Sequence, residues 1–438
     1  MTHTTQKGQI LVLALLMLMV LCGLMLSFFY VGQINYQAVR QRHALDAATY
    51  SAATLQAQTL NYAAYMNRAY AGHQVAMAHL VTLASWAHFA ATQAQRLQRA
   101  NPPVSLITMM FGPKHGMAYQ SAVLAAPAVT PGLIDTQLKN LFQQHQAYSP
   151  LIFEPHSHTI YQDLPQHREQ RLRAVLHDNY PELNLEQNSH LMQLEVTDDT
   201  WHQLLEWRAA SSWQPWLHEL INHYDFLKPR HQTAKNAWVV QARCPHKRHE
   251  LRRRGQTQLN SSGHWQAEDT LSFHALRANR WIGCYFREYA MGWAWAQSHE
   301  PEQKEPPFET APEDFSEQDF WRWVQEHTQW DIHEGSANGV AQAWARRDQI
   351  SWPGQGLRPY LSLRDQPEQF RFKTRLALQM QADAQVIHSQ SEAKNTYVLP
   401  QARRDQRQEK PNLFQPYWQA ALANSEWEHR LRLLKGEF

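Results

Sequence analysis

The chain has 438 residues, with 41 lysines and arginines against 39 aspartates and glutamates, and its mean hydropathy is −0.59. This balance of charge gives no reason to expect a nucleic-acid partner, and no basic tract suggests a patch for anionic lipids. The length suffices for two or three domains with a substantial core.

The first element is an apolar run from Ile10 to Val31, which contains no charged side chain. As a helix it would span roughly 33 Å, close to the roughly 30 Å hydrocarbon core of a bilayer. A cleaved signal peptide has a shorter apolar stretch, about 7–15 residues, that ends in a small-x-small site. This run is longer and leaves through Phe28, Phe29 and Tyr30. It predicts a transmembrane helix over residues 10–31, after a tail of residues 1–9.

The direction of this helix across the membrane does not follow from charge. Lys7 and the α-amine lie on one flank of the apolar run, whereas Arg40 and Arg42 lie on the other. Neither flank therefore has the clear excess of lysine and arginine that marks a cytoplasmic side.

A long helix is expected to continue out of the apolar run. The segment from residue 34 to 97 contains no proline and one glycine, Gly72, and alanine recurs throughout it. Because alanine has the best helix propensity, we expect a helix over residues 32–100, until Asn101-Pro102-Pro103 stops it. A helix of this length needs a packing partner, so we expect it to lie against its own globular part or against other subunits.

The remainder of the chain predicts an α+β fold, with a mixed helical and antiparallel-sheet region after the helices. Residues 101–299 are expected to be helical at first, most clearly at Ile134–Phe142 and Thr200–Tyr224, and to form strands from about residue 238. The turn-forming residues 260–263 precede an alternation of polar and apolar side chains over residues 270–275, which is typical of a strand after a hairpin turn.

The last third begins with residues 300–315, where prolines among acidic residues predict a linker. A C-terminal α+β region, residues 316–438, follows it. The clearest strand there is Phe370–Gln381, in which apolar and polar side chains alternate. This pattern is typical of a half-buried strand in an antiparallel sheet.

The 25 histidines suggest a metal-binding site, but their spacing does not support one. His218 and His223 are five residues apart, whereas a zinc-protease helix needs four so that both histidines reach one metal. Cys244, His246 and His249 lack a second ligand group at a matching spacing. No nucleophile elbow, phosphate-binding loop or dinucleotide fingerprint is present. We therefore expect no enzyme activity, no metal site and no cofactor.

The three cysteines fall in two different settings. Cys22 lies inside the apolar run, where it is expected to behave as a small apolar residue. Cys244 and Cys284 both lie beyond the run and could form a disulfide in an oxidising compartment. Sequence alone leaves that pairing open, because it does not show whether the two Cα atoms come within bridging distance.

Several segments occur in a recognisable order along the chain. A polar leader ends at Gly8 and is followed by Gln9, the apolar helix and a stretch rich in alanine from residue 44. This order resembles the TadE/TadG type of Flp (tight-adherence) pilus-assembly proteins, and the continuation over residues 60–69 and the segment Pro411–Trp418 resemble a long-chain branch of this group. The resemblance covers about residues 6–90, is thin across the middle and returns near the end. The family-like residues are Ala44, Asp46, Ala47, Ala48, Asn61, Asn67 and Arg68.

The resemblance implies a single-pass protein of the bacterial inner membrane, with its N-terminus in the cytoplasm and its bulk in the periplasm. It would be a non-catalytic component of a pilus or secretion system. Its partners would be the lipid bilayer, other pilus-assembly or pseudopilin-like membrane proteins and, as a further expectation, other copies of itself, but not nucleic acid.

Two departures from the family pattern concern processing and metal binding. Prepilin-type cleavage between Gly8 and Gln9 would place Leu13 where precursors cut by a prepilin peptidase carry glutamate. Some TadG proteins hold a metal through Asp-x-Ser-x-Ser, but the corresponding residues 314–318 lack the last serine. The sequence therefore predicts no such metal site.

A hypothesis from a different class is a membrane-tethered periplasmic binding module or adhesin. The chain has 17 tryptophans, and some of them cluster, as at Trp293 and Trp295. Exposed aromatic side chains of this kind could stack on the sugar rings of a glycan or of the cell wall. Large aromatic residues of the core are the simpler interpretation.

Overall fold

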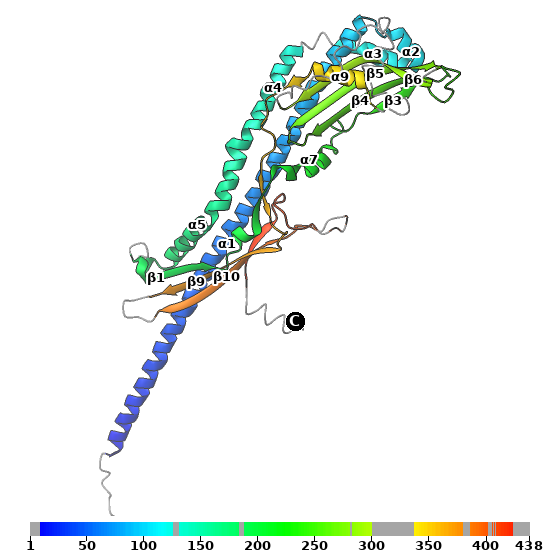
Figure 1. Cartoon of the computed structure of the whole chain (residues 1–438). Helices are drawn as coiled ribbons and strands as arrows, with labels where there is room; N and C mark the ends of the chain where they lie inside the picture. The colour runs from blue at the N-terminus through cyan, green and yellow to red at the C-terminus, as the bar shows by residue number, and fades with distance from the viewer. Residues whose placement is uncertain are drawn as a thin grey trace, which may run out of the picture. The chain divides into compact units, whose positions relative to one another are not determined.

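A computed structural model of the chain describes residues 9–125, 131–183, 188–280, 283–299, 337–379, 386–401, 405, 407 and 409–423. Helices and antiparallel sheets make up an α+β protein, as expected (Figure 1). Contacts divide the chain into two units that interleave along the sequence. Unit 1 comprises Met1–Asn67, His156–Trp207 and Leu361–Phe438, and unit 2 comprises Arg68–Pro155 and Arg208–Tyr360.

Helix α1, Gln9–Gln98, contributes residues to both units. The prediction of a helix that continues out of the apolar run is confirmed. Ala100 then takes a left-handed backbone conformation, with φ of 49°, directly before Asn101 and Pro102. A left-handed residue after the last turn is a common way for a helix to end.

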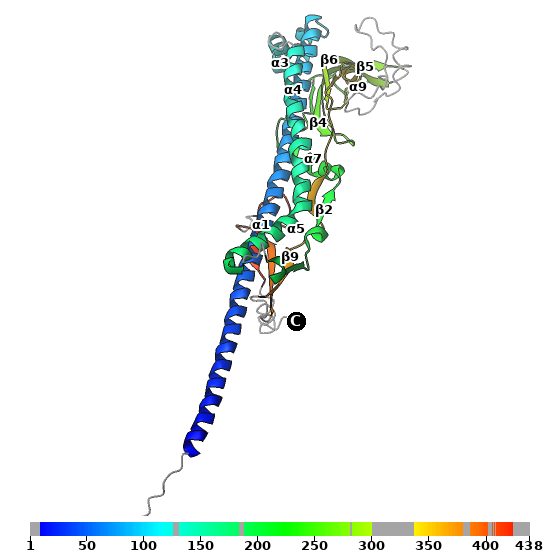
Figure 2. The ribbon, with the colours of Figure 1, turned by 90° about the vertical axis from the view of Figure 1, so that its left-hand side faces the viewer.

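Unit 1 places α1 and helix α5, Glu154–Asn179, beside one another (Figures 1 and 2). An antiparallel sheet packs against both helices, and its strand order is β1-β9-β10-β11. These strands are β1 Met192–Thr197, β9 Gln369–Leu378, β10 Ile387–Tyr397 and β11 Trp418–Leu422.

The core of unit 1 joins one face of α1 to the sheet. Ala44, Leu45, Ala48 and Ala52 are buried and recur at intervals of one to four residues, so they share a helix face. Small alanine side chains let the helix backbone approach the sheet closely. The residues that they meet in this core include Leu172 and Leu176 of α5 and Phe372, Leu376 and Leu378 of β9.

Strand β9 confirms the predicted alternation within the described residues. Phe370, Phe372 and Leu376 are buried, whereas the charged residues between them are not. The strand ends at Leu378, and residues 380 and 381 of the predicted segment lie outside the described residues.

Unit 2 contains a five-stranded sheet with the order β3-β4-β5-β6-β7. Its strands pair antiparallel except β6 and β7, which are parallel. They are β3 Gln232–Lys235, β4 Glu250–Leu259, β5 Trp265–Asn279, β6 Gly283–Gln297 and β7 Ile350–Ser351.

The helices of unit 2 are α2 Val104–Phe111, α3 Pro113–Ala125, α4 Pro131–Tyr148, α7 Trp213–Ile221 and α9 Gly339–Arg347. Further short elements of the chain are η2 Ser149–Phe153, α6 Trp201–Leu204, β2 Leu205–Arg208 and β8 Tyr360–Leu363.

Helices cover both faces of the central strands of this sheet. Phe273 of β5 packs in a cluster with Ile107 of α2 and Tyr119 of α3, whereas Trp293 of β6 packs with Trp344 of α9. Side chains on both faces of β5 are consequently buried, including the polar residues 270, 272 and 274.

One expectation from the sequence needs correction, and two others fall on residues that the structure does not describe. The predicted helical segment Thr200–Tyr224 is wrong in part, because β2 interrupts it and α7 covers only Trp213–Ile221. The expected linker 300–315 lies outside the described residues, and so do residues 314–318. The expected boundary at residue 100 lies close to the end of α1 at Gln98.

Candidate functional site

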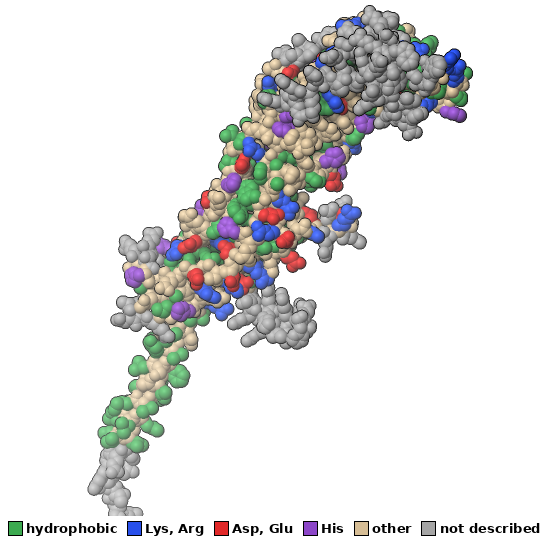
Figure 3. Space-filling model, viewed as in Figure 1, with side chains coloured by type: hydrophobic (Ala, Val, Ile, Leu, Met, Phe, Trp, Pro, Cys, Tyr) green, Lys and Arg blue, Asp and Glu red, His purple; other side chains and the backbone are tan. Residues whose placement is uncertain are grey.

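The N-terminal part of α1 carries a long run of exposed apolar side chains. It is long and apolar enough to cross a membrane, and none of its most apolar window is buried. Apolar side chains surround it, with no charged side chain among them (Figure 3). Monomeric proteins in water rarely leave so large a patch uncovered. Gln9 begins this helix, whereas Gly8 lies outside the described residues.

Exposed aromatic residues follow at the end of the apolar run, where Tyr30 and Tyr36 lie on the helix surface. Tyrosine is enriched where a membrane-spanning helix meets water, because its ring is apolar and its hydroxyl is polar. The first fully buried residue of the helix is Gln41, five residues after Tyr36. The packed segment of α1 therefore begins shortly after the exposed segment ends.

Polar side chains join the packed face of α1 to the sheet of unit 1. The Gln41 amide donates to the carbonyl oxygens of Leu376, at 3.2 Å, and Ile387, at 2.9 Å. The family-like Asp46 accepts a hydrogen bond of 2.6 Å from the Ser391 hydroxyl. Every bond of this kind satisfies a buried polar group that would otherwise cost about 1–3 kcal/mol. The helix is thereby fixed in one register against β9 and β10.

Two further family-like residues of α1 bind the C-terminal segment Pro411–Trp418. Asn61 donates to the Trp418 carbonyl, at 3.0 Å, and accepts from the Trp418 N–H, at 2.9 Å. Asn67 donates to the carbonyls of Leu413, at 2.8 Å, and Leu361, at 3.0 Å. The two stretches that carry the family resemblance are therefore in direct contact.

The other family-like residues have different surroundings. Ala44 and Ala48 are buried in the core, where their small size is used for packing. Ala47 and Arg68 are exposed. The set therefore serves packing and hydrogen bonding, and it does not gather into a cluster with acid, base or nucleophile.

A buried ion pair in unit 1 was not foreseen from the sequence. Arg168 of α5 is 1% exposed and pairs with Asp199, and its guanidinium also donates to the Gln56 amide oxygen of α1 at 2.6 Å. The same group lies 4.4 Å from the centre of the Phe372 ring. A single arginine thus ties α5, α1 and β9 together, and no local sequence pattern marks it.

A groove runs between α1 and α5 within unit 1. It has two adjoining parts, of about 670 and about 300 Å³, which share Leu55, Gln58 and His167. Tyr50 lines the first part and Tyr62 the second. The walls are mostly uncharged, with Arg171 as an exception that donates to the Ser51 hydroxyl at 3.0 Å.

Unit 2 contains a pocket of about 670 Å³ with aromatic walls, which include Trp86, Phe89 and Phe226. Tyr119 also lines it, and its buried hydroxyl has no hydrogen-bond partner within the described residues. Burial raises the pKa of Tyr119, so the hydroxyl keeps its proton. A donor of this kind beside aromatic walls suits a small polar group on a largely apolar ligand.

Two arginines at the edge of this pocket share one buried carboxylate. Arg253 contacts Asp269 at 2.7 Å and Arg230 contacts it at 3.1 Å, while the Ser85 hydroxyl donates to it at 2.7 Å. Burial lowers the pKa of Arg253. The Arg253 guanidinium also lies 3.8 Å from the centre of the Phe89 ring, a cation–π geometry.

A second buried polar network lies at the start of α9. The Glu288 carboxylate accepts from the backbone N–H groups of Val340, at 2.9 Å, and Ala341, at 3.1 Å, and from the Ser272 hydroxyl, at 2.7 Å. It thereby satisfies backbone donors at the N-terminus of the helix, where negative charge is also favoured. Burial raises the pKa of Glu288.

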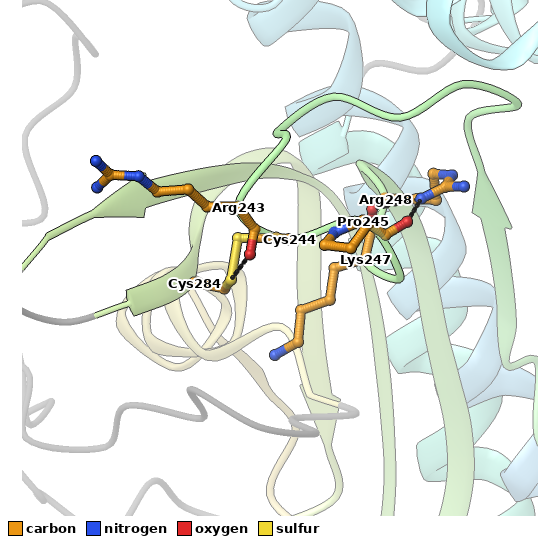
Figure 4. The surroundings of a disulfide bond; sticks show 6 residues. All are labelled: Arg243, Cys244, Pro245, Lys247, Arg248 and Cys284. Atoms are coloured by element: carbon orange, nitrogen blue, oxygen red, sulfur yellow. Dashed lines mark hydrogen bonds between the residues drawn. A yellow bond between two sulfur atoms is a disulfide. The ribbon is translucent and has the colours of Figure 1, made fainter.

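Cys244 and Cys284 form a disulfide, which resolves the pairing that the sequence left open (Figure 4). The bond joins the loop before β4 to the first residues of β6. Cys244 is therefore not available as a metal ligand with His246 and His249. Within the described residues, no group of three or more His, Cys, Asp or Glu side chains is arranged to hold a metal ion.

No family model matches the sequence, and neither the curated proteins nor the solved structures contain a significant match.

Proposed function

We propose that this chain is a single-pass inner-membrane component that builds or anchors a Flp/Tad-type pilus or secretion system without catalysing a reaction. Its N-terminus would lie in the cytoplasm and its bulk in the periplasm. Its partners would be the bilayer and other pilus-assembly or pseudopilin-like membrane proteins.

The observation that carries the proposal is the contact of Asn61 and Asn67 with Pro411–Trp418. The motifs at the two ends of the chain form one packed element, as expected if they are the structural signature of a shared fold. This element lies on the same helix as the exposed apolar segment.

The disulfide supports the periplasmic placement of the bulk. Disulfides persist in the bacterial periplasm and are rare in the cytosol, where thiols are kept reduced. The Cys244–Cys284 bond lies far beyond the apolar segment in the chain. It thereby supports an orientation that the charges around the apolar segment do not indicate.

An in-frame deletion of the gene tests the pilus assignment. Surface pili and adherence should be lost and should return when the wild-type gene is restored. Intact piliation in the deletion strain would contradict the proposal.

The orientation of the chain is tested separately by fusing alkaline phosphatase after residue 100. This fusion should give an active enzyme, whereas a reporter that is active only in the cytoplasm should be inactive at the same position.

The aromatic pocket of unit 2 favours a second candidate, a tethered binding module for glycan or cell wall. Trp86 is 41% exposed at this pocket, and its ring could stack on a sugar. The detergent-solubilised full chain should then be retained on purified cell wall, and Trp86→Ala should reduce retention. Trp238→Ala is the matched control, because Trp238 is similarly exposed and does not line the pocket. Equal retention of the wild type and both variants would exclude this binding mode.

A further inference from the structure

One face of α1 in unit 1 is largely exposed and borders the groove to α5, where Tyr62 contacts His156. Its residues are spaced three or four apart, so they share one side of the helix. Four of them are tyrosines, and the face begins directly after the apolar segment. We call it the tyrosine stripe, and it consists of Tyr36, Val39, His43, Ala47, Tyr50, Thr54, Gln58, Tyr62 and Tyr65, all exposed except the half-buried Thr54.

The stripe contains no lysine, arginine, aspartate or glutamate. The nearby charged residues of α1 point elsewhere and have other contacts: Arg40 pairs with Glu182 at 2.6 Å, and Asp46 accepts from Ser391. Arg42 is exposed but does not belong to the stripe. When two identical helices pair in parallel, equivalent residues face each other, and equal charges at these positions would repel. An uncharged stripe avoids this repulsion.

The groove between α1 and α5 lies along the same part of the helix. Tyr50 and Tyr62 belong both to the stripe and to the walls of the groove. A helix packed on the stripe could therefore place its own large side chains into the groove. Tyrosine is enriched in such interfaces, because it buries a large ring and keeps a hydroxyl for hydrogen bonding.

We propose that the tyrosine stripe is where two copies of this chain associate, with their α1 helices parallel and side by side. This inference rests on the proposed membrane anchor. A bilayer that holds residues 10–31 of both copies keeps their stripes at the same height and raises their effective concentration. The same surface then meets itself around a two-fold axis, as in most homodimers. The small Ala47 lies within the stripe, where it lets the two backbones approach.

Cysteine crosslinking in native membranes tests this arrangement with the full chain. In a Cys22→Ser background, which keeps the Cys244–Cys284 disulfide, Ala47→Cys, Tyr50→Cys and Thr54→Cys should each give disulfide-linked dimers on mild oxidation. Arg42→Cys on α1 and Glu169→Cys on α5 are matched controls, because both positions are exposed and outside the stripe. These controls should remain monomeric.

A charge at the centre of the stripe provides a second test. Ala47→Glu places two carboxylates opposite each other and should abolish the dimers formed by Tyr50→Cys. A thermal unfolding transition unchanged from the wild type shows that the variant is folded. Dimers that persist in Ala47→Glu would overturn the proposal. Equal crosslinking at stripe and control positions, or crosslinks to another protein in place of dimers, would overturn it as well.

Failure of this inference is distinguishable from failure of the proposed function. If alkaline extraction releases the protein from membranes, the anchor is absent and both proposals fall. If the protein stays in the membrane and the deletion abolishes pili, but the stripe gives no dimers, only the self-association is wrong.

Discussion

Asn61 and Trp418 are 357 residues apart in sequence, yet the Asn61 side chain pairs with both the N–H and the carbonyl of Trp418. The amide of Asn61 thus takes the place that a neighbouring strand would take in a sheet. Trp418 is 2% exposed, so neither backbone group has easy access to water. This contact holds the first residue of β11 on α1.

Asn61→Ala should therefore destabilise unit 1 by about 2–4 kcal/mol, because it leaves two buried backbone groups without partners. Denaturant unfolding of the detergent-solubilised protein measures this loss. Arg68→Ala is the control, since Arg68 is a family-like residue with an exposed side chain, and it should change stability little. Equal effects of the two variants would show that the Asn61 contact contributes nothing.

Removal of Arg168 should cost about 3–5 kcal/mol, because it leaves Asp199 without its buried partner. The comparison is Arg173→Ala, which breaks an exposed pair with Glu169 on the same helix. That pair should contribute less than about 1 kcal/mol. Thermal unfolding of the two variants side by side distinguishes the buried from the exposed pair, and similar shifts in Tm would contradict the assignment.

Cys284→Ser should lower the stability of unit 2, because the disulfide closes a loop of 40 residues. The loss expected from the chain entropy of such a loop is about 4 kcal/mol, with 2–4 kcal/mol typical of measured disulfides. Cys22→Ser provides the control and should leave unfolding unchanged. Reduction of the wild-type protein should reproduce the Cys284→Ser value, and a reduced protein of unaltered stability would refute this contribution.

Acid should destabilise unit 2 through His274, which donates to the Asn338 amide oxygen at 3.0 Å. Burial, with Arg252 nearby, lowers the pKa of His274 to about 3 from an ordinary value of 6.5. Between these two values the unfolded chain binds a proton that the folded chain excludes. Stability is therefore lost as the pH falls below about 6.5, by roughly 1.4 kcal/mol per pH unit.

Unfolding measured between pH 7 and pH 5 checks this slope. His274→Gln removes the titrating group, so the variant should lose stability less steeply over the same range. Burial raises the pKa of Glu288, and its protonation in the folded state opposes the loss as the pH falls. An identical slope in wild type and His274→Gln would mean that other groups dominate.

Local patterns predicted the elements whose signals lie within their own residues. The helix from the apolar run to Gln98 follows from alanine content and the absence of proline, and β9 follows from its alternation. The hairpin before β5 follows from turn residues, since the Asn260 side chain accepts from the N–H of Ser262 at 3.1 Å. Each of these signals lies within a few residues of the structure that it specifies.

Contacts between distant segments could not be predicted in this way. The pairing of Arg168 with Asp199 depends on how α5 packs, and the burial of His274 depends on α9, which lies more than 60 residues further along the chain. The alternation in β5 is the same whether one face or both faces are covered. Sequence patterns also imply contiguous domains, whereas both units take segments from before and after each other.

The order in which the chain is made gives the Asn61–Trp418 contact a consequence for biogenesis. A ribosome completes α1 first and adds β11 near the end. At about 5–20 residues per second, roughly 20 to 70 s separate the synthesis of Asn61 from that of Trp418, which lies 357 residues later. During that interval the strands that contact α1 are not all translated. The amides of Asn61 and Asn67 and the apolar face of the helix therefore lack their partners. A nascent chain stalled before β11 would therefore present this helix to the chaperones and proteases of its compartment.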